Sequence, residues 1–448
     1  MSDTGHPTGA AQTSRRDFIR ASSLLVAGGA VTGGLSIGRA AHPHGSDLIR
    51  VALVGCGRRG REAAVEALHT AGGPVKLVAL ADVFPDRLQS CLRHIKGALK
   101  QDRGDQCDVP RDRQFVGLDA YQRALETDAD LVILATPPGF RPLHFEAAVA
   151  AGKHAFLEKP VAVDAPGVRR VLAANEEAKR KNLAVAVGLQ RRHETAYRET
   201  VARIQEGCIG DIVTLRVYWN SGTGREPAPR QERQGELDYQ LRNWNYFTWL
   251  CGDHIVEQHV QNLDVGNWLM RDTPVTVNAQ GGRDAHNPAA LGQIFDHFFC
   301  EFTYAPNVKM FSQCRLVKNT WNSVAEHVHA TKGHADIQGG KIYSPSGELI
   351  WHTRGRRGGH RQEQHDLFTA LRAGETPNEA DYGARSTMTA ILGRMAAYSG
   401  QRIAWHDAVA STIALAAVDS LASLDSPAPV QPEGDNYPVA VPGVTRTV

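Results

Sequence analysis

Three glycines at a fixed spacing suggest a phosphate-binding turn. Gly55, Gly57 and Gly60 follow the apolar run IRVALV and precede a stretch with helical character. The first glycine permits a tight turn, the second lets the backbone approach a pyrophosphate, and the third lets the helix pack on the strand. Arg58 and Arg59 lie in the same loop, where the start of a helix also favours an anion. The pattern predicts a bound dinucleotide, and the alternative is a glycine-rich turn in a sheet that holds no cofactor.

A carboxylate at the end of the next strand indicates which dinucleotide is bound. The run LVALADV contains Asp82, twenty-two residues after Gly60. A carboxylate at this place accepts hydrogen bonds from the adenosine ribose hydroxyls and repels the 2′-phosphate of NADP. The sequence therefore predicts NAD as the cofactor, with NADP the less favoured alternative.

The elements that must position these residues follow from the alternation of apolar runs and helical stretches. From Ile49 to the run HAFLEKP this alternation predicts a parallel, doubly wound Rossmann sheet over residues 48–165, with residues 183–190 as one more strand. Thr136 and Pro137 end one of its strands at the carboxyl edge, where ligands of open α/β folds bind, although a stiff loop explains them equally well.

The remainder of the chain has a different pattern. Beyond Gly210, longer alternating runs separated by turns predict an open, mainly antiparallel sheet in a second, α+β domain over residues 166–420. Helices are expected at Gln362–Ala373 and Ser386–Ser399. Residues 421–448 form an extended tail that packs on a neighbour or on the domain itself.

Composition excludes several classes of partner. The 448 residues are 42% hydrophobic and 22% charged, which fits two globular domains, and the net charge is only +2. With no long basic run, we expect neither nucleic acid nor an anionic membrane as a partner. The seven cysteines are odd in number and lack CxxC spacing, so the sequence predicts free thiols and no metal site.

The N-terminus resembles an export signal. Arg15 and Arg16 precede an uncharged stretch at 21–38 that is too short and too rich in glycine to span a bilayer. Residues 1–40 therefore resemble a twin-arginine signal peptide, which predicts a periplasmic or otherwise exported protein whose cofactor is loaded before export. The alternative is a disordered tail that contains two arginines.

Five motifs, taken in order, resemble the Gfo/Idh/MocA oxidoreductases, the group that includes inositol dehydrogenase and glucose-fructose oxidoreductase. They are GCGRRG, ADVFPDR, ATPPGFRPLHFEAAVAAGKHAFLEKPVA, GLQRR and GDHIVEQHVQNLDVGNW, and the resemblance covers roughly residues 48 to 420. It implies an N-terminal Rossmann domain and a C-terminal domain whose open sheet forms the sugar site. It also implies a homo-oligomer.

The resemblance implies roles for single residues. Lys159, beside Glu158, matches the family's lysine close to the nicotinamide, where an ammonium can donate to the substrate oxygen and assist proton transfer. The family's second element is an Asp, a His four residues later and another Asp three beyond. Here Glu257, Gln261 and Asp264 hold those places. Because glutamine cannot act as a base, His259, His254 or Asp253 in the same segment could supply it instead, and the alternative for His259 is a packing role.

Further residues are candidates for binding. Gln190 and Arg191 end the run LQRR near the expected cofactor crevice, where they either bind cofactor and substrate or form a solvated loop. Tyr239 and Trp244 combine stacking faces with hydrogen-bond donors, as carbohydrate sites do. With Asp264, they are the predicted substrate-binding residues.

The resulting functional hypothesis is an NAD(P)-dependent oxidoreductase acting on a CH–OH group of a sugar, polyol or glycoside, with a tightly held cofactor. One alternative is a redox-neutral, NAD-dependent glycosidase or lyase in which bound NAD transiently oxidises the sugar. The other is a sugar- or nucleotide-binding protein without catalysis, which the glutamine at position 261 favours.

Overall fold

The structure is a computed structural model that describes residues 47–99, 103–222, 227–284, 289–355 and 358–448. The elements below all belong to the compact unit Ala40–Val448. The expected twin-arginine signal at residues 1–40 lies outside the described residues. None of the helices in the described ranges has both the length and the apolar character that a membrane span requires.

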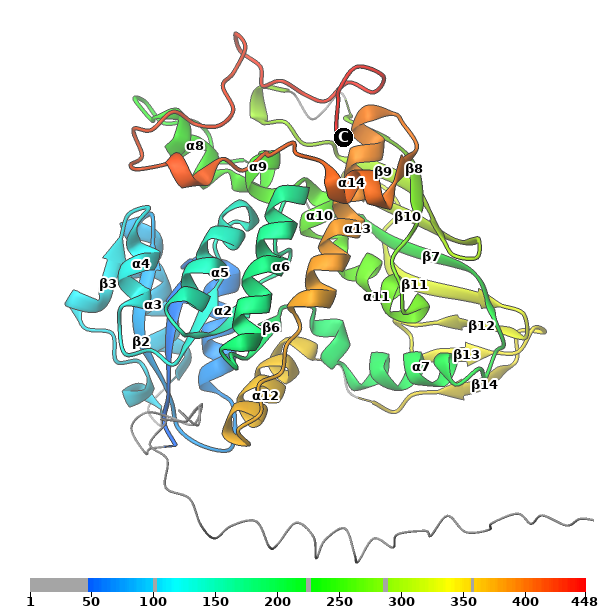
Figure 1. The fold of residues 1–448 in the computed structure, drawn as a ribbon, viewed down its shortest axis with the longest axis horizontal. Helices are drawn as coiled ribbons and strands as arrows, with labels where there is room; N and C mark the ends of the chain where they lie inside the picture. The colour runs from blue at the N-terminus through cyan, green and yellow to red at the C-terminus, as the bar shows by residue number, and fades with distance from the viewer. Residues whose placement is uncertain (1–46, 100–102, 223–226, 285–288, 356–357) are drawn as a thin grey trace, which may run out of the picture. The chain divides into compact units, whose positions relative to one another are not determined.

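Six parallel strands form the first sheet, in the order β3-β2-β1-β4-β5-β6, which confirms the predicted doubly wound topology (Figure 1). The strands are β1 Ile49–Val54, β2 Val75–Asp82, β3 Gln114–Val116, β4 Leu131–Leu134, β5 His154–Leu157 and β6 Val185–Val187. The last strand pairs in parallel with β5 and lies within the run 183–190. Both faces of the central strands are buried, which explains their continuous apolar sequence.

Helices cover both faces of this sheet. They are α2 Arg58–Leu68, α3 Pro85–Leu99, α4 Ala120–Leu125, α5 Arg141–Ala150 and α6 Ala165–Arg180. Along β1, Val51 and Leu53 pack in one apolar cluster with α2 and α3, whereas Ala52 and Val54 pack in another with α5 and α6. The first cluster also takes in Phe368 of α12 (Gly359–Arg372), so a helix from the far end of the sequence completes the Rossmann layer.

Nine strands form the second sheet, in the order β14-β13-β12-β11-β7-β10-β9-β8-β15. They are β7 Ile212–Ser221, β8 Thr276–Gly282, β9 His297–Tyr304, β10 Val308–Leu316, β11 Ser323–Ala330, β12 Gly333–Asp336, β13 Lys341–Tyr343, β14 Leu349–His352 and β15 Ile403–Ala404. Every neighbouring pair is antiparallel except β7 and β10, whose carboxyl ends meet at Ser221 and Leu316. The predicted, mainly antiparallel sheet is confirmed.

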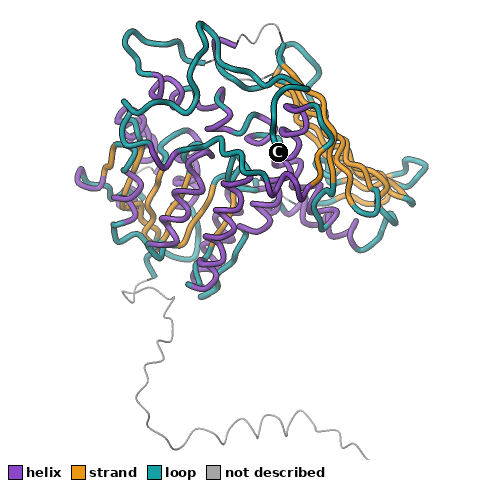
Figure 2. The backbone as a smooth tube through the Cα atoms, turned by 45° about the horizontal axis from the view of Figure 1, so that its top comes forward, coloured by secondary structure: helices purple, strands orange, loops and turns teal. Residues whose placement is uncertain are grey.

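Helices pack on one face of the second sheet, as Figure 2 shows. They include α7 Thr195–Gln205, α11 Val260–Met270, α13 Ala380–Ser399 and α14 Trp405–Ala410. The two expected late helices are present, although α13 begins six residues before the predicted Ser386. Its first turn is buried at Ala380 and Ala384, and this burial extends a helix whose start the sequence does not mark.

A layer of short helices and the C-terminal tail lies over the carboxyl ends of the Rossmann strands (Figure 1). It contains α8 Glu236–Arg242, α9 Thr248–Cys251 and α10 His254–Glu257. The Tyr437 hydroxyl donates to Glu236 Oε1 at 2.6 Å, and Gln240 Nε2 donates to the Val430 carbonyl at 2.7 Å. The tail was expected to pack either on a neighbouring molecule or on the domain itself. In the structure it packs on α8 of the same chain.

Candidate active site

A cavity of 880 Å³ runs along the carboxyl ends of β1, β2, β4 and β5 and reaches β7 and α10 of the C-terminal part. Most of the residues that the sequence singled out line it. They are Gly55, Gly57, Arg58, Arg59, Asp82, Thr136, Pro137, Glu158, Lys159, Trp244, Glu257 and Gln261. The fold therefore joins the predicted cofactor loop and the predicted catalytic segment in one space.

The glycine loop has the geometry that a pyrophosphate requires. Gly55 has φ +100°, and a Cβ on it would lie 2.5 Å from the backbone of Ala135. A Cβ on Gly60 would lie 1.9 Å from the Gly55 carbonyl oxygen, so the close strand–helix packing needs glycine. A Cβ on Gly57 would instead enter open cavity space, and no side chain caps α2 there. The first N–H groups of α2 are thus available to a phosphate.

Asp82 is fixed at the end of β2. Its Oδ2 accepts from the backbone N–H of Cys56 at 2.7 Å, and its Oδ1 accepts from that of Phe84 at 2.9 Å. Burial raises the pKa of Asp82 above its ordinary value, although the two N–H hydrogen bonds act to lower it. Each carboxylate oxygen keeps acceptor capacity, so the side chain can also receive two ribose hydroxyls.

Arg141 connects the ends of β4 and β5. It is buried, and its guanidinium donates to the carbonyls of Leu134 at 2.6 Å, Thr136 at 2.7 Å and Glu158 at 3.0 Å. Burial lowers its pKa to about 10, which still leaves it protonated at neutral pH. Sequence reasoning missed this residue, because a single arginine in a loop before a proline gives no sign that it will be buried.

Lys159 and Glu257 form the centre of the cavity. Lys159 follows β5, whereas Glu257 ends α10, and the lysine Nζ lies 3.0 Å from Glu257 Oε1. The same ammonium donates to the main-chain carbonyl of Glu257. Since an ammonium has three donors, one remains for a ligand oxygen.

Arg59 has a different role from the one predicted. Its guanidinium donates to Glu158 Oε1 at 2.6 Å, to Glu66 Oε2 at 3.0 Å and to Glu363 Oε1 at 3.2 Å. Burial acts to lower its pKa, but these carboxylates outweigh burial and raise the pKa above its ordinary value. Arg59 lines the cavity, yet it ties α2 to β5 and α12 instead of offering its charge to a phosphate.

Gln261 is a hydrogen-bond donor in this cavity. Gln190 Nε2 donates to Gln261 Oε1 at 2.9 Å. The oxygen and nitrogen of each amide are assigned from this hydrogen bond. The Gln261 amide nitrogen is left to face a ligand, and it can donate to a hydroxyl but cannot accept a proton. Gln190 itself lies behind Gln261 and does not line the cavity.

His259 lies outside the cavity, contrary to the prediction that it could supply a base. It is fully buried and its Nε2 lies 2.7 Å from Ser312 Oγ. Burial lowers its pKa to about 3, so the ring is neutral at physiological pH. The packing alternative therefore holds, because the ring is buried against Ser312 and lines no part of this cavity.

Three predicted substrate-binding residues also lie outside the cavity. Arg191 is buried in an ion pair with Glu326, and Asp264 accepts from Arg192 at 2.8 Å. Tyr239 is buried with the Arg230 guanidinium 4.1 Å from its ring. Each of these polar groups has its partner inside the protein, so the structure gives them a packing role and corrects the prediction.

Other residues of the cavity escaped sequence reasoning. Gln258 lines it directly beside Glu257, and that proximity in the chain was the available signal. His360, from α12, also lines the cavity. It lies about two hundred residues after Lys159 in the chain and has no sequence signal of its own. Arg87 and Phe84 follow Asp82 closely and line the cavity beside it.

Comparison with known proteins agrees with this geometry. Residues 49–188 match the model of the Gfo/Idh/MocA oxidoreductase family with its NAD-binding Rossmann fold. These residues therefore form an NAD-binding Rossmann domain. Inositol 2-dehydrogenase of Rhizobium meliloti is 28% identical over 232 residues, which are 52% of this chain and 58% of the relative. The chain thus aligns with about three fifths of that relative's length.

Solved structures share the fold over a longer stretch. Aldose-aldose oxidoreductase from Caulobacter crescentus, complexed with glycerol, superposes with a TM-score of 0.62 and 17% identity, over 80% of this chain and 99% of the other. Levoglucosan dehydrogenase, in complex with NADH and levoglucosan, gives a TM-score of 0.62 and 18% identity over the same shares. These similarities show that the fold shared with the solved structures includes the C-terminal sheet.

The role of Arg141 gives a stability prediction. Arg141→Met removes the side-chain donor of the Thr136 and Glu158 carbonyls, whereas the Leu134 carbonyl still accepts from the Glu158 N–H at 3.0 Å. We expect a loss of about 3 kcal/mol in the free energy of unfolding. Arg180→Met is the matched control, because Arg180 is 72% exposed and pairs only with Glu177 on its own helix. Its loss should be below about 1 kcal/mol. Urea unfolding of both variants measures the difference, and equal losses would contradict the assigned role.

Proposed function

We propose that this protein is an NAD-dependent oxidoreductase that oxidises a CH–OH group of a sugar or polyol. The observation that carries the proposal is the pairing of Lys159 Nζ with Glu257 Oε1 at 3.0 Å, in the cavity that also contains the glycine loop and Asp82. A donor and acceptor pair at the carboxyl edge of a Rossmann sheet suits a hydroxyl next to a nicotinamide. The names of the relatives, inositol and levoglucosan dehydrogenases, support the same substrate class.

The residues divide the chemistry between them. Bound NAD supplies the acceptor for the hydride that leaves the substrate carbon. The Lys159 ammonium donates at Nζ to the oxygen of the reacting hydroxyl, and the Glu257 carboxylate beside it can accept the hydroxyl proton. Gln261 donates an amide N–H to a substrate oxygen and orients the ring.

Replacing Lys159 tests this division. Lys159→Met should reduce kcat by about 10²- to 10⁴-fold, the usual contribution of a general acid or base, while NADH still binds. The matched control is Lys153→Met, since Lys153 donates to the Thr127 carbonyl and lines no cavity. Initial rates with inositols and aldoses, together with NADH titration by fluorescence, measure both effects. A Lys159 variant that turns over at the wild-type rate would remove the proposed mechanism.

We also propose that Asp82 selects NAD over NADP. Its carboxylate lines the cavity near Arg87, so removing its charge leaves a cation near a 2′-phosphate. Asp82→Asn should therefore raise the affinity for NADP relative to NAD by about tenfold or more, since one like-charge contact disappears. Asp108→Asn is the control, because Asp108 is exposed and pairs with Lys76 at the other end of β2. Unchanged selectivity in titrations of both cofactors would refute the assignment.

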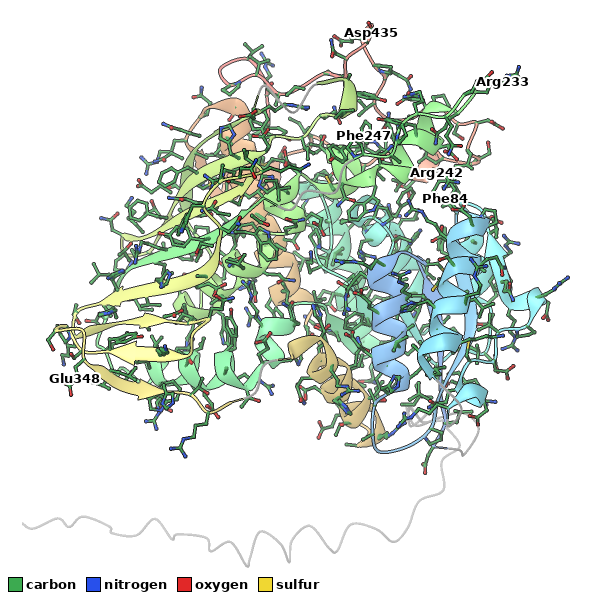
Figure 3. The ribbon with its side chains drawn as sticks, turned by 180° about the vertical axis from the view of Figure 1, so that it is seen from behind. Phe84, Arg233, Arg242, Phe247, Glu348 and Asp435 are labelled. Carbon is green, nitrogen blue, oxygen red and sulfur yellow. The ribbon has the colours of Figure 1, made fainter. Side chains whose placement is uncertain are left out.

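A further proposal is that the cofactor is retained. The Arg242 guanidinium lies 3.9 Å from the Phe84 ring centroid and pairs with Asp86 at 3.2 Å, so α8 is fixed over the Asp82 end of the cavity (Figure 3). The Arg87 guanidinium donates to the Arg242 carbonyl at 3.2 Å. The tail holds α8 from above through Tyr437. A dinucleotide beneath this cover leaves only when α8 moves.

Retention fits the proposed export by the twin-arginine route, which rests on Arg15 and Arg16. Outside the cytoplasm free NAD is scarce, so a dissociated cofactor is lost. Retention for hours requires a dissociation rate on the order of 10⁻⁴ per second, and with an association rate of about 10⁶ per molar per second the Kd is roughly 0.1 nM. The hydride must then pass to the carbonyl carbon of a second compound, whose oxygen takes up a proton, before the next turnover.

Cofactor content measures retention directly. Protein purified from the periplasm and then denatured should release close to one nicotinamide per chain. Arg242→Ala should lose its cofactor about tenfold faster, because it removes a cation–π contact and an ion pair from the cover. Arg203→Ala is the matched control, since Arg203 lies over Trp351 and does not line the cofactor cavity. Clearly less than one nicotinamide per wild-type chain, with activity dependent on added NAD, would refute retention.

A further inference from the structure

A second cavity of 650 Å³ adjoins the first. It lies between α9 and α10 on one side and the ends of β7, β8 and β10 on the other. Asn245, Glu257 and Gln258 line both cavities. Because Glu257 is the partner of Lys159, the second cavity opens beside the proposed reaction centre.

Two buried polar atoms of the second cavity have no protein partner. His254 is 3% exposed, and its Nε2 is buried without a hydrogen bond within the described part of the chain. Gln258 Oε1 is likewise buried without a hydrogen-bond partner among the described residues. Since nearly all buried polar atoms in proteins are paired, such atoms at a cavity wall indicate a ligand with hydroxyl or amide groups.

The orientation of His254 is fixed by its neighbour. Asp253 Oδ1 accepts from the His254 backbone N–H at 2.6 Å and lies 3.3 Å from its Nδ1. Asp253 has φ +75° and is held by Tyr398, whose hydroxyl donates to Oδ2 at 2.5 Å. With Nδ1 directed at a carboxylate, Nε2 is the ring nitrogen left for a ligand, an assignment that follows from this hydrogen bond.

The remaining wall combines polar groups with apolar surfaces. Leu291, Ile294 and Leu316 provide apolar faces, whereas Asp284 and Asn319 provide polar groups. A sugar ring presents C–H faces and hydroxyl edges, so this mixture matches a pyranose better than a lipid or an aromatic ring. The first cavity has to hold the dinucleotide and the reacting unit.

We propose that the second cavity binds the second unit of a glycoside whose first unit is oxidised at Lys159 and Glu257. This inference rests on the proposed function and names its substrate as a glycoside or disaccharide instead of a free monosaccharide. His254 and Gln258 form hydrogen bonds with hydroxyl groups of the second unit. Both residues act in specificity and take no part in hydride or proton transfer.

Matched pairs of substrates test the proposal on the cofactor-loaded protein. The pairs are glucose with cellobiose and maltose, galactose with lactose, and myo-inositol with galactinol. For the pair that is oxidised, kcat/KM should be about tenfold or more higher for the glycoside, since a second unit adds buried hydrogen bonds. Leu291→Trp, which fills the second cavity, should bring this ratio close to one. Leu349→Trp, at an exposed position on β14 outside both cavities, should leave it unchanged.

Binding separates this proposal from the proposed function. Calorimetric titration of the NADH-loaded protein with the same compounds should show tighter binding of a glycoside, weakened about tenfold by His254→Ala and by Leu291→Trp. Glycoside binding without any oxidation would remove the proposed function and support the second cavity. Oxidation of a monosaccharide with equal kcat/KM for its glycoside, unaffected by Leu291→Trp, would overturn the second cavity and leave the proposed function standing.

Discussion

The guanidinium of Arg141 is the constraint on which the site depends. Parallel strands leave their last carbonyls unpaired at the carboxyl edge, and buried carbonyls without donors cost free energy. Arg141 donates to three carbonyls at the ends of β4 and β5, and one of them, that of Leu134, also accepts from the Glu158 N–H. The chain that continues from these ends carries Thr136 on one side and Lys159 on the other. The placement of Thr136 relative to Lys159 is thus set by a residue that belongs to neither β4 nor β5.

A second, half-buried arginine extends this constraint to the C-terminal part. Arg59 joins the start of α2 to Glu158 at the end of β5 and to Glu363 of α12. Separating these charges would leave a buried carboxylate uncompensated, which is costly in a low-dielectric interior. The arrangement fixes the glycine loop, the Lys159 loop and α12 together. The cofactor loop therefore depends on a helix more than three hundred residues away in the sequence.

The C-terminal part supplies the other half of the reaction centre. Helix α10 brings Glu257 to Lys159, and the same helix carries His254 into the second cavity. One short helix thus faces two spaces, since its ends contribute to different walls. Above it, α8 and the tail cover the Asp82 end through Phe84 and Arg242. The site is closed by segments that lie after the Rossmann domain in the sequence.

The sequence by itself determined the features that depend on local spacing. The glycine loop, Asp82 at the end of its strand, the alternation of strands and helices, and the turn-separated runs of the second sheet are each encoded within some thirty residues. For that reason the two sheets and most of the cofactor half of the cavity were predictable. The position of Lys159 was predictable from its motif, and so was the glutamine at 261.

The tertiary structure decided which polar side chains face the cavity. His259 and Arg191 carry the residue types of a site, yet they point into the core, where Ser312 and Glu326 satisfy them. Arg141 looked like a loop residue and became the centre of the carboxyl edge. A polar side chain can serve a ligand only where it faces the cavity and keeps a donor or acceptor beyond its partners in the protein. That pairing depends on burial and on partners far away in the sequence, which spacing along the chain does not encode.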